Sequence, residues 1–184
     1  MPYYGIDGGF MHTSSEIKKY LLGPQFEHRL VHRYKRFEIL AEGALRTAVV
    51  NLLRSRLSKV GGTAKGYRVT CETRLPGTNV VPDILIFRND KPRIWIELKD
   101  TASFNPKAAE ADWKKLQALC PKYPTVKAGY LIYVARRARQ KFLIKRTCAT
   151  LRFWAVPIVL EECMGSAFRE WDEKYRTLAH YRVA

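Results

Sequence analysis

The sequence predicts an α/β domain with a mixed central sheet flanked by helices. Its 184 residues, 47% of them apolar, suffice for one domain with a sizeable core. Apolar residues recur at helical spacing before residue 60, and three strand-like runs follow between residues 67 and 99. A helix and a further buried strand come next. This order of helix, three strands, helix and strand is typical of an α/β domain.

The first 28 residues predict an N-terminal extension, which consists of an irregular arm and a short helix. The first dozen residues hold three glycines without any periodicity. The run EIKKYLL predicts a helix that Ser14 or Ser15 can cap and that Gly23 and Pro24 end. After Pro24 the apolar spacing is again helical to about residue 59, over a length that allows a break near Gly43.

Three consecutive strands are predicted at residues 67–75, 80–87 and 93–99. The first run, YRVTCETRL, alternates and is rich in residues that favour strands. The sequence RNDKP between the second and third runs has turn chemistry. The second and third strands are therefore expected to form a hairpin.

The second half of the chain predicts two further helices and two further strands. Asn105 and Pro106 provide an N-cap and a first helical position. The continuous apolar run at residues 128–135 is typical of a buried strand. The run FWAVPIVLE predicts another strand, in which Pro157 favours an edge position or a bulge. Residues 166–180 repeat aromatic and apolar side chains at helical spacing, which predicts a C-terminal helix.

Three charged side chains interrupt the predicted hairpin, although its strands otherwise have the pattern of buried sheet. They are Asp83, Glu97 and Lys99. A turn centred near Asp90 places Asp83 opposite Glu97, where facing Cβ atoms lie about 4.5–5.5 Å apart. Because side chains alternate along a strand, Lys99 shares the face of Glu97 and Leu98 points away. A register error of one residue would turn Asp83 to the other face.

Two facing carboxylates on a largely apolar sheet repel each other, and desolvation increases the repulsion. A divalent cation resolves this conflict, and oxygen-only ligands favour Mg²⁺ or Mn²⁺ over Zn²⁺. An ammonium one pleat away could orient a water molecule and offset the charge of a phosphate. Asp83, Glu97 and Lys99 therefore predict a site for phosphodiester hydrolysis. The structural alternative is a glutamate and a lysine that are simply solvated on an edge strand.

At these residues the chain resembles the PD-(D/E)xK nuclease superfamily, with Pro82-Asp83 and Glu97-Leu98-Lys99 as the signature. The resemblance implies a restriction-endonuclease-like αβββαβ core over residues 29–160, preceded by the extension of residues 1–28 and followed by a C-terminal helix in residues 161–184. It also implies Mg²⁺-dependent (or Mn²⁺-dependent) cleavage of DNA, less often of RNA. In that reading Asp83 and Glu97 are metal ligands and Lys99 is the catalytic lysine.

Members of this superfamily often add an acid from the first core helix. Glu42 is our preferred candidate for this catalytic and metal-binding role, and Glu38 is the alternative, one turn away. The structural alternative for Glu42 is an exposed ion pair with Arg46 at i, i+4. A polar residue on the helix after the lysine strand sometimes contributes as well. Asp112, Lys115 and Gln117 stay open for that role.

The charge of the chain favours a polyanionic partner. Lys and Arg number 33 against 17 Asp and Glu, which gives a net charge of +16. Nucleic acid is the first candidate, with DNA as the expected form, and an acidic membrane surface is the second. A merely supercharged surface is the alternative. Basic clusters lie at residues 28–36, 54–59 and 135–146. The residues selected as nucleic-acid-binding candidates are Arg54, Arg136, Arg137, Arg139, Lys141, Lys145 and Arg146.

Several other classes of protein and site are disfavoured. The four cysteines form no CxxC pair, so free thiols in a reducing compartment are expected rather than a zinc ribbon. His28 and His32 lack the acid and the third ligand of a zinc protease. The N-terminus has no secretory pattern, and no stretch is long and apolar enough to span a membrane. A cytoplasmic protein without a membrane partner is therefore expected.

The sequence predicts an endonuclease acting on DNA, and two alternatives stay open. One is a non-catalytic nucleic-acid-binding domain of the same fold, and the other is a metal-dependent RNA endonuclease. Because many enzymes of this type pair subunits to cut two strands, a homodimer is also expected. The choice between restriction, repair, recombination and phage functions, and between endonuclease and exonuclease action, stays open.

Overall fold

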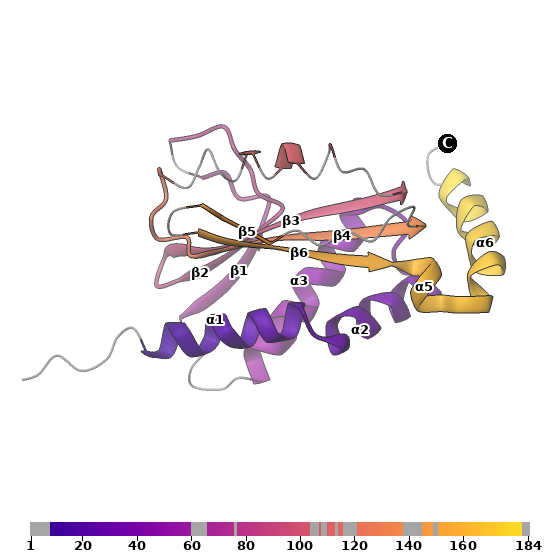
Figure 1. Ribbon diagram of the computed structural model, residues 1–184, viewed down its shortest axis with the longest axis horizontal. Helices are drawn as coiled ribbons and strands as arrows, with labels where there is room; N and C mark the ends of the chain where they lie inside the picture. Colours follow the sequence, from indigo (N-terminus) through magenta and orange to yellow (C-terminus); the bar gives the residue numbers. More distant parts are fainter. Residues whose placement is uncertain are drawn as a thin grey trace, which may run out of the picture.

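The computed structural model describes residues 8–59, 66–75, 77–103, 107, 110–112, 114–115, 121–137, 145–148 and 151–181. These residues form an α/β structure around one open, mixed sheet (Figure 1). The predicted α/β class with a mixed sheet flanked by helices is therefore confirmed.

The sheet has six strands in the order β1-β2-β3-β4-β6-β5 over the described residues. The strands are β1 (Tyr67–Cys71), β2 (Ile84–Arg88), β3 (Lys91–Ser103), β4 (Ala128–Arg137), β5 (Lys145–Cys148) and β6 (Leu151–Val159). β1, β2 and β3 form an antiparallel meander, whereas β3, β4 and β6 run parallel and β5 is antiparallel to β6. The long central strands β3 and β4 lie in the middle of the sheet.

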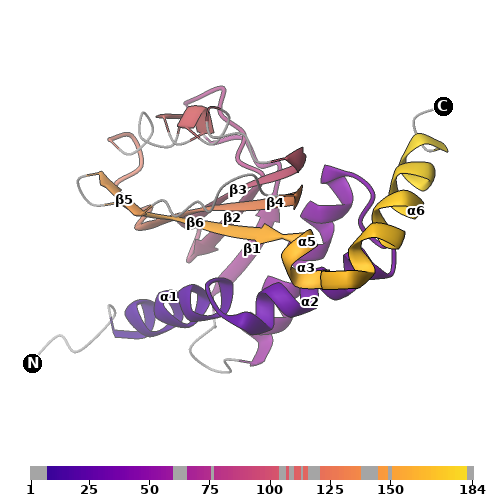
Figure 2. The same ribbon diagram turned by 45° about the vertical axis from the view of Figure 1, so that its right-hand side comes forward.

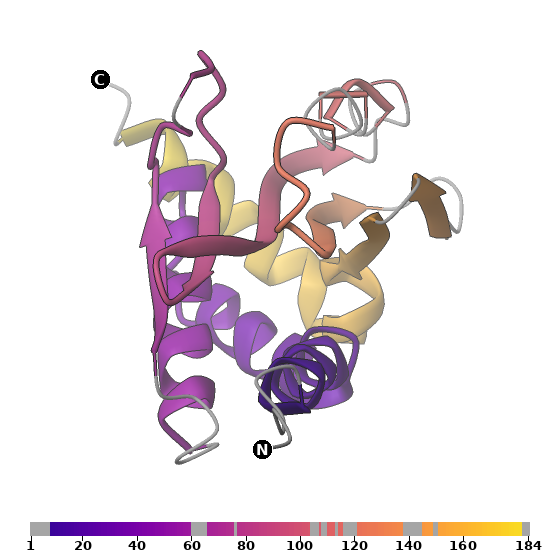
Figure 3. The same ribbon diagram turned by 90° about the vertical axis from the view of Figure 1, so that its left-hand side faces the viewer.

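Three helices cover one face of the sheet, and two more follow β6. The first three are α1 (Gly8–Leu21), α2 (Pro24–Lys35) and α3 (Glu42–Lys59), and the last two are α5 (Leu160–Met164) and α6 (Phe168–Tyr181). Figure 2 shows α6 beside the end of the α1–α3 layer. In Figure 3 the helical residues between 107 and 115 lie on the other side of the sheet from α1–α3. The described residues contain no helix with the length and apolarity that a membrane crossing requires.

Side-chain alternation in β2 and β3 divides the core into two clusters. The face toward the helices buries the isoleucines of both strands together with Leu98. The other face buries Leu85 and Trp95 with Leu131 and Tyr133 of β4. This division agrees with the predicted faces of the hairpin, because the spacing of apolar residues on both strands has period two.

The helical run predicted after Pro24 is two helices. Phe37 has a φ of 57°, a left-handed conformation that a right-handed helix cannot continue through. The helix break that was predicted near Gly43 thus lies at residues 36–41, just before Gly43. α1 starts at Gly8, earlier than the predicted caps at Ser14 and Ser15.

The predicted domain boundaries fall within helices. The boundary after residue 28 lies inside α2, and the boundary after residue 160 lies inside α5. Ile17 and Leu21 of α1 are buried in the same core cluster as α2 and α3, so the N-terminal helix is packed onto the sheet domain.

The last predicted strand is confirmed as β6. β5 pairs only with residues 151–154 of β6, so Pro157 lies beyond the segment that β5 covers, as an edge position requires.

Candidate active site on the β2–β3 hairpin

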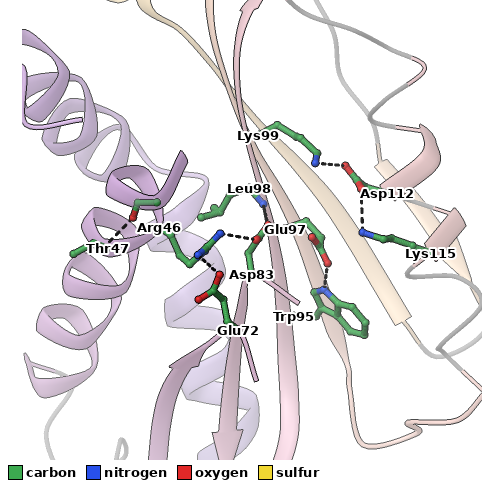
Figure 4. A network of polar contacts seen from close by, with 11 residues as sticks. Arg46, Thr47, Glu72, Asp83, Trp95, Glu97, Leu98, Lys99, Asp112 and Lys115 are labelled. Carbon is green, nitrogen blue, oxygen red and sulfur yellow. Dashed lines mark hydrogen bonds and ion pairs between the residues drawn. The ribbon is translucent and has the colours of Figure 1, made fainter. Parts of the chain in front are cut away.

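The β2–β3 hairpin brings Asp83 and Glu97 together. Ile84 pairs with Ile96 and Leu85 with Trp95, so the same register places Asp83 beside Glu97. The Oδ2 atom of Asp83 accepts a hydrogen bond from the backbone N–H of Leu98 at 2.8 Å (Figure 4). The predicted register is therefore confirmed.

The turn of this hairpin and a register shift between Ile86 and Phe87 together set the register, because the turn alone would place Asp83 opposite Ile96. Arg88 pairs with Lys91, which leaves Asn89 and Asp90 as the two turn residues. Their φ values of 48° and 60° are the left-handed pair of a type I′ turn, whose twist matches that of the strands. The N–H of Asn89 also donates to the carbonyl of Gly66 at 3.1 Å. Asparagine and aspartate tolerate this conformation better than most residues, and the predicted turn centre is confirmed.

Asp83 is half-buried and forms an ion pair that the sequence did not predict. Its Oδ1 atom lies 3.5 Å from Nη2 of Arg46, which comes from α3 (Figure 4). The Nη1 atom of the same guanidinium donates to Glu72 at the end of β1. Arg46 thus pairs with two acids of the sheet, in place of the exposed i, i+4 pair with Glu42 that was the structural alternative. The Asp83 carboxylate is held by one backbone N–H and one guanidinium.

Glu97 is only 3% exposed and lies on the face of Trp95. The indole Nε1–H of Trp95 donates to Oε1 of Glu97 at 2.6 Å. Burial raises the pKa of Glu97 above its usual range, the Trp95 bond acts to lower it, and the charge of Asp83 raises it further. The carboxylate of Asp83 is therefore close enough to oppose the ionisation of Glu97.

Lys99 lies farther along the same face of β3 and points toward the helical residues between 107 and 115 (Figure 4). Its Nζ atom is 3.4 Å from Oδ2 of Asp112, which is 6% exposed, and Lys115 approaches the other oxygen of Asp112 at 3.6 Å. Burial acts to lower the pKa of Lys99, but Asp112 first and Glu42 next raise it, and the net effect is an increase. Lys99 is thus held as an ammonium near the two carboxylates.

The two candidate helix acids have different surroundings. Both carboxylate oxygens of Glu38 are engaged, by Arg33 at 3.2 Å and by Arg36 at 3.1 Å. Glu42 is the first residue of α3, and its charge acts on the pKa values of both Lys99 and Asp100. Glu42 is therefore close enough to Lys99 and Asp100 for its charge to act on both, whereas Glu38 belongs to an arginine cluster. The metal-binding role of Glu42 stays a prediction.

The pair of carboxylates fits a hard cation in its donor chemistry. Asp83 and Glu97 supply carboxylate oxygens, and their mutual repulsion is relieved when a cation lies between them. Among the residues that the structure describes, no group of three His, Cys, Asp or Glu side chains is close enough to hold an ion. A divalent ion here would use the two acids and complete its coordination with water, as Mg²⁺ does at many phosphate-processing sites.

Asp100 is an acid that sequence reasoning missed, on the opposite face of β3 from Lys99. Its Oδ2 atom accepts a hydrogen bond from the hydroxyl of Tyr34 in α2 at 3.0 Å. Burial raises the pKa of Asp100 from its ordinary value of 3.8 to about 6. The alternation of side chains along β3 predicts that Asp100 lies on the opposite face from Lys99. Its hydrogen-bond partner Tyr34 could not be predicted, because it lies far away in the sequence.

The predicted nucleic-acid-binding residues have varied positions. Arg54 donates to the backbone carbonyl of Val69 at 3.1 Å and so fixes α3 against β1. Arg136 lies over the ring of Tyr175, and Arg137 pairs with the buried Asp172 of α6 at 3.2 Å. Arg139 and Lys141 lie outside the described residues, as do the side chains of Lys145 and Arg146, whose backbone forms part of β5.

No protein-family model, curated protein sequence or solved structure matches this chain. An acid pair on adjacent strands, an ammonium on the same face and a guanidinium at the edge together can hold a cation and bind an anionic group beside it.

Proposed function

We propose that this chain is a Mg²⁺-dependent endonuclease that hydrolyses phosphodiester bonds of DNA, built on a restriction-endonuclease-like core. The observation that carries the proposal is the convergence of Asp83 and Glu97 across the β2–β3 hairpin, with Lys99 on the same face. The order α3, β1, β2, β3, helical residues, β4 agrees with an αβββαβ core. The net charge of +16 supports a polyanionic substrate.

Asp83 and Glu97 are the residues that would hold the metal ion. Mg²⁺ bound there would supply Lewis-acid polarisation of the scissile phosphodiester. The backbone N–H of Leu98 engages Oδ2 of Asp83, and the indole of Trp95 engages Oε1 of Glu97. The ion would therefore use Oε2 of Glu97 and Oδ1 of Asp83, in exchange for the contact of Oδ1 with Arg46 at 3.5 Å. Because these two N–H donors belong to β3 itself, the two carboxylates are positioned before any ligand arrives.

Lys99 and Arg46 would act on the substrate. The ammonium of Lys99 can stabilise negative charge on the phosphate and orient the attacking water, and Asp112 keeps it protonated and in place. The guanidinium of Arg46 is near Asp83 and can offer N–H groups to a neighbouring phosphate oxygen. Glu42, across from Lys99, is the acid that α3 would contribute.

The test is a cleavage assay with isosteric variants. Labelled duplex, single-stranded and branched DNA and RNA are incubated with the protein and Mg²⁺ or Mn²⁺. Asp83→Asn and Glu97→Gln are each expected to lower the cleavage rate by at least about a hundredfold, because each removes one carboxylate ligand. Asp90→Asn, at the exposed hairpin turn, is the matched control and should retain full activity.

The outcomes separate the alternatives. Cleavage of DNA that Asp83→Asn abolishes supports the proposal, and cleavage restricted to RNA would replace the DNA substrate by RNA. Binding of nucleic acid without cleavage of any substrate would replace the enzyme by a non-catalytic binding domain. Cleavage that is unchanged in both Asp83→Asn and Glu97→Gln would show that the hairpin is not the active site.

A further inference from the structure

A basic cavity lies on the outer side of the helical layer. Its volume is about 410 Å³, and α2, the turn after it and Leu52 of α3 form its walls. We call it the α2 cavity. Its basic and acidic lining residues are His28, Arg29, His32, Arg33, Arg36 and Glu38. They follow one exposed stripe of α2, because the opposite stripe, with Leu30 and Tyr34, is buried in the core.

Ion pairs hold the charged side chains of this cavity in place. Glu38 pairs through one oxygen with Arg33 and through the other with Arg36, so a single carboxylate holds two guanidinium groups side by side. Three arginines against one glutamate leave the lining positively charged, and the two imidazoles add N–H donors. The positive field extends beneath the helix. Burial raises the pKa of Tyr20, while Arg29, Arg56 and Arg33 each act to lower it.

The helix dipole accounts for only part of this stripe. Cations are favoured in the last turn of a helix, which explains Arg33 and Lys35 in α2. His28 and Arg29 lie in the first half of α2, where the dipole gives cations no advantage. The dipole therefore does not explain His28 and Arg29; Arg29 interacts with Tyr20, and the positive charge of the cavity suits an anionic ligand.

The α2 cavity and the carboxylate pair lie on opposite sides of the sheet. The side chains of α2 that face inward pack on the face that carries Ile96 and Leu98. Glu97 and Lys99 point to the other face, toward Trp95 and Asp112 (Figure 4). The helical layer and the sheet separate the two sites, so one straight short duplex cannot occupy both.

We propose that the α2 cavity binds the phosphate backbone of a nucleic-acid segment other than the segment at Asp83 and Glu97. From His28 to Arg36 the stripe extends about 12 Å along the helix. Successive phosphates of one strand advance about 3.4 Å along a duplex, so the stripe matches several phosphates in a row. A repeating phosphate backbone therefore fits the stripe better than a single free phosphate does. Each arginine can donate two parallel hydrogen bonds to the oxygens of one phosphate.

The test measures binding without divalent cations, so that cleavage plays no part. Affinity for a duplex of about 40 base pairs is recorded against salt concentration for the wild type and for Arg29→Ala/Arg36→Ala. The slope of log K against log salt should fall in magnitude by about 2 in this variant, because each phosphate contact contributes about 0.9. Lys122→Ala/Lys127→Ala removes the same charge from exposed positions of the loop before β4 and should leave the slope unchanged.

A second measurement counts the bound segments. With duplexes of about 12 base pairs, roughly one helical turn, calorimetry should give two per wild-type chain and one per Arg29→Ala/Arg36→Ala chain. The proposal is overturned if the wild type binds one short duplex only, or if the variant keeps the slope of the control. A different ligand would also overturn the proposal. In that case the wild type and the variant would bind the duplex with equal affinity, and only the wild type would bind inorganic pyrophosphate or vesicles containing phosphatidylserine. Because these readouts need no cleavage, they stand apart from the test of the active site.

Discussion

Glu97 is a buried acid with one hydrogen bond from Trp95 and an acidic neighbour in Asp83. Such an environment disfavours the ionised form, and a domain without a function for the charge would be more stable with a neutral residue there. The proposed metal-binding function would account for the presence of an acid at this position. It follows that substitution of Glu97 by a neutral residue should raise the stability of the protein and lower its activity.

Glu97→Gln should stabilise the free protein and abolish cleavage. The amide oxygen can still accept the Trp95 hydrogen bond. A neutral amide also avoids both the buried charge beside Asp83 and the uptake of a proton that the raised pKa of Glu97, about 8, imposes on folding at neutral pH. We expect a gain on the order of 1–2 kcal/mol in the free energy of unfolding at neutral pH. Urea unfolding with and without Mg²⁺ measures it, and Mg²⁺ should stabilise the wild type but not the variant. A less stable variant would contradict this account of Glu97.

Asp112→Asn should lower the pKa of Lys99. Asp112 is the strongest of the groups that raise this pKa against the effect of burial, and the amide removes its charge while keeping its shape. The titration of the Lys99 side chain, followed by NMR, reads the change directly. Glu110→Gln, on the same helical segment, is the matched control. An unchanged titration in Asp112→Asn would show that the ion pair has no influence on Lys99.

The sequence revealed Asp83, Glu97 and Lys99 because their grouping depends on local rules. The two-residue turn, the alternation of side chains and the register shift between Ile86 and Phe87 together set which side chains meet across the hairpin. Arg46 and Asp100 depend instead on contacts between distant parts of the chain, Arg46 with Glu72 and Asp83, and Asp100 with Tyr34. No local period encodes such partners.

At the scale of elements, the bond between Tyr34 and Asp100 connects α2 to β3. The hydroxyl of Tyr34 is buried, and burial followed by the charge of Asp100 raises its pKa well above the ordinary value. Next to this bond, the carbonyl of Tyr34 accepts the indole N–H of Trp171 in α6 at 2.7 Å. Tyr34 therefore joins three elements at the end of β3, close to the candidate active site.

Asp100 should make the stability of the protein depend on pH. Its folded-state pKa of about 6 exceeds its ordinary value of 3.8, so between these values the folded state binds more protons than the unfolded state. Its contribution to the free energy of unfolding should therefore fall as pH rises from about 4 to about 6. Asp100→Asn should remove this decrease and be more stable at pH 7 by up to about 3 kcal/mol.

Urea unfolding at several pH values between these limits measures the effect. Asp90→Asn is the control, because the side chain of Asp90 is 93% exposed and its substitution should leave the profile unchanged. Parallel profiles for the wild type and Asp100→Asn would contradict the assignment. The comparison of the wild type with Asp100→Asn also tests whether the hydrogen bond from Tyr34 in α2 to β3 persists when its acceptor is a neutral amide.

Elements with a strong local pattern were predicted, and those determined by context were not. The hairpin, β4 and the C-terminal helix follow from period and turn residues alone. The end of α2 depends on the left-handed conformation of Phe37, a bulky residue that gives no such signal in the sequence. β5 is a four-residue strand whose partner is β6, and so short a strand is determined by its neighbour rather than by its own composition.

At the scale of the whole molecule, the net charge of +16 should dominate the association with nucleic acid. We expect the protein to be isolated with bound nucleic acid at low salt and to release it at high salt, because phosphate contacts depend steeply on salt concentration. The ratio of absorbance at 260 and 280 nm across a salt gradient follows the release. Retention that does not change with salt would contradict an electrostatic mode of binding.

The hairpin has a consequence for how quickly the chain reaches its native state. Asp83 and Glu97 are on two arms joined by a two-residue turn, so they meet once that turn and the register shift between Ile86 and Phe87 have formed, whether or not the helices have docked. We infer that the unfavourable interaction between the two acids is already present in the folding transition state. We expect neutralisation of either acid, or millimolar magnesium, to accelerate refolding and not merely to slow unfolding.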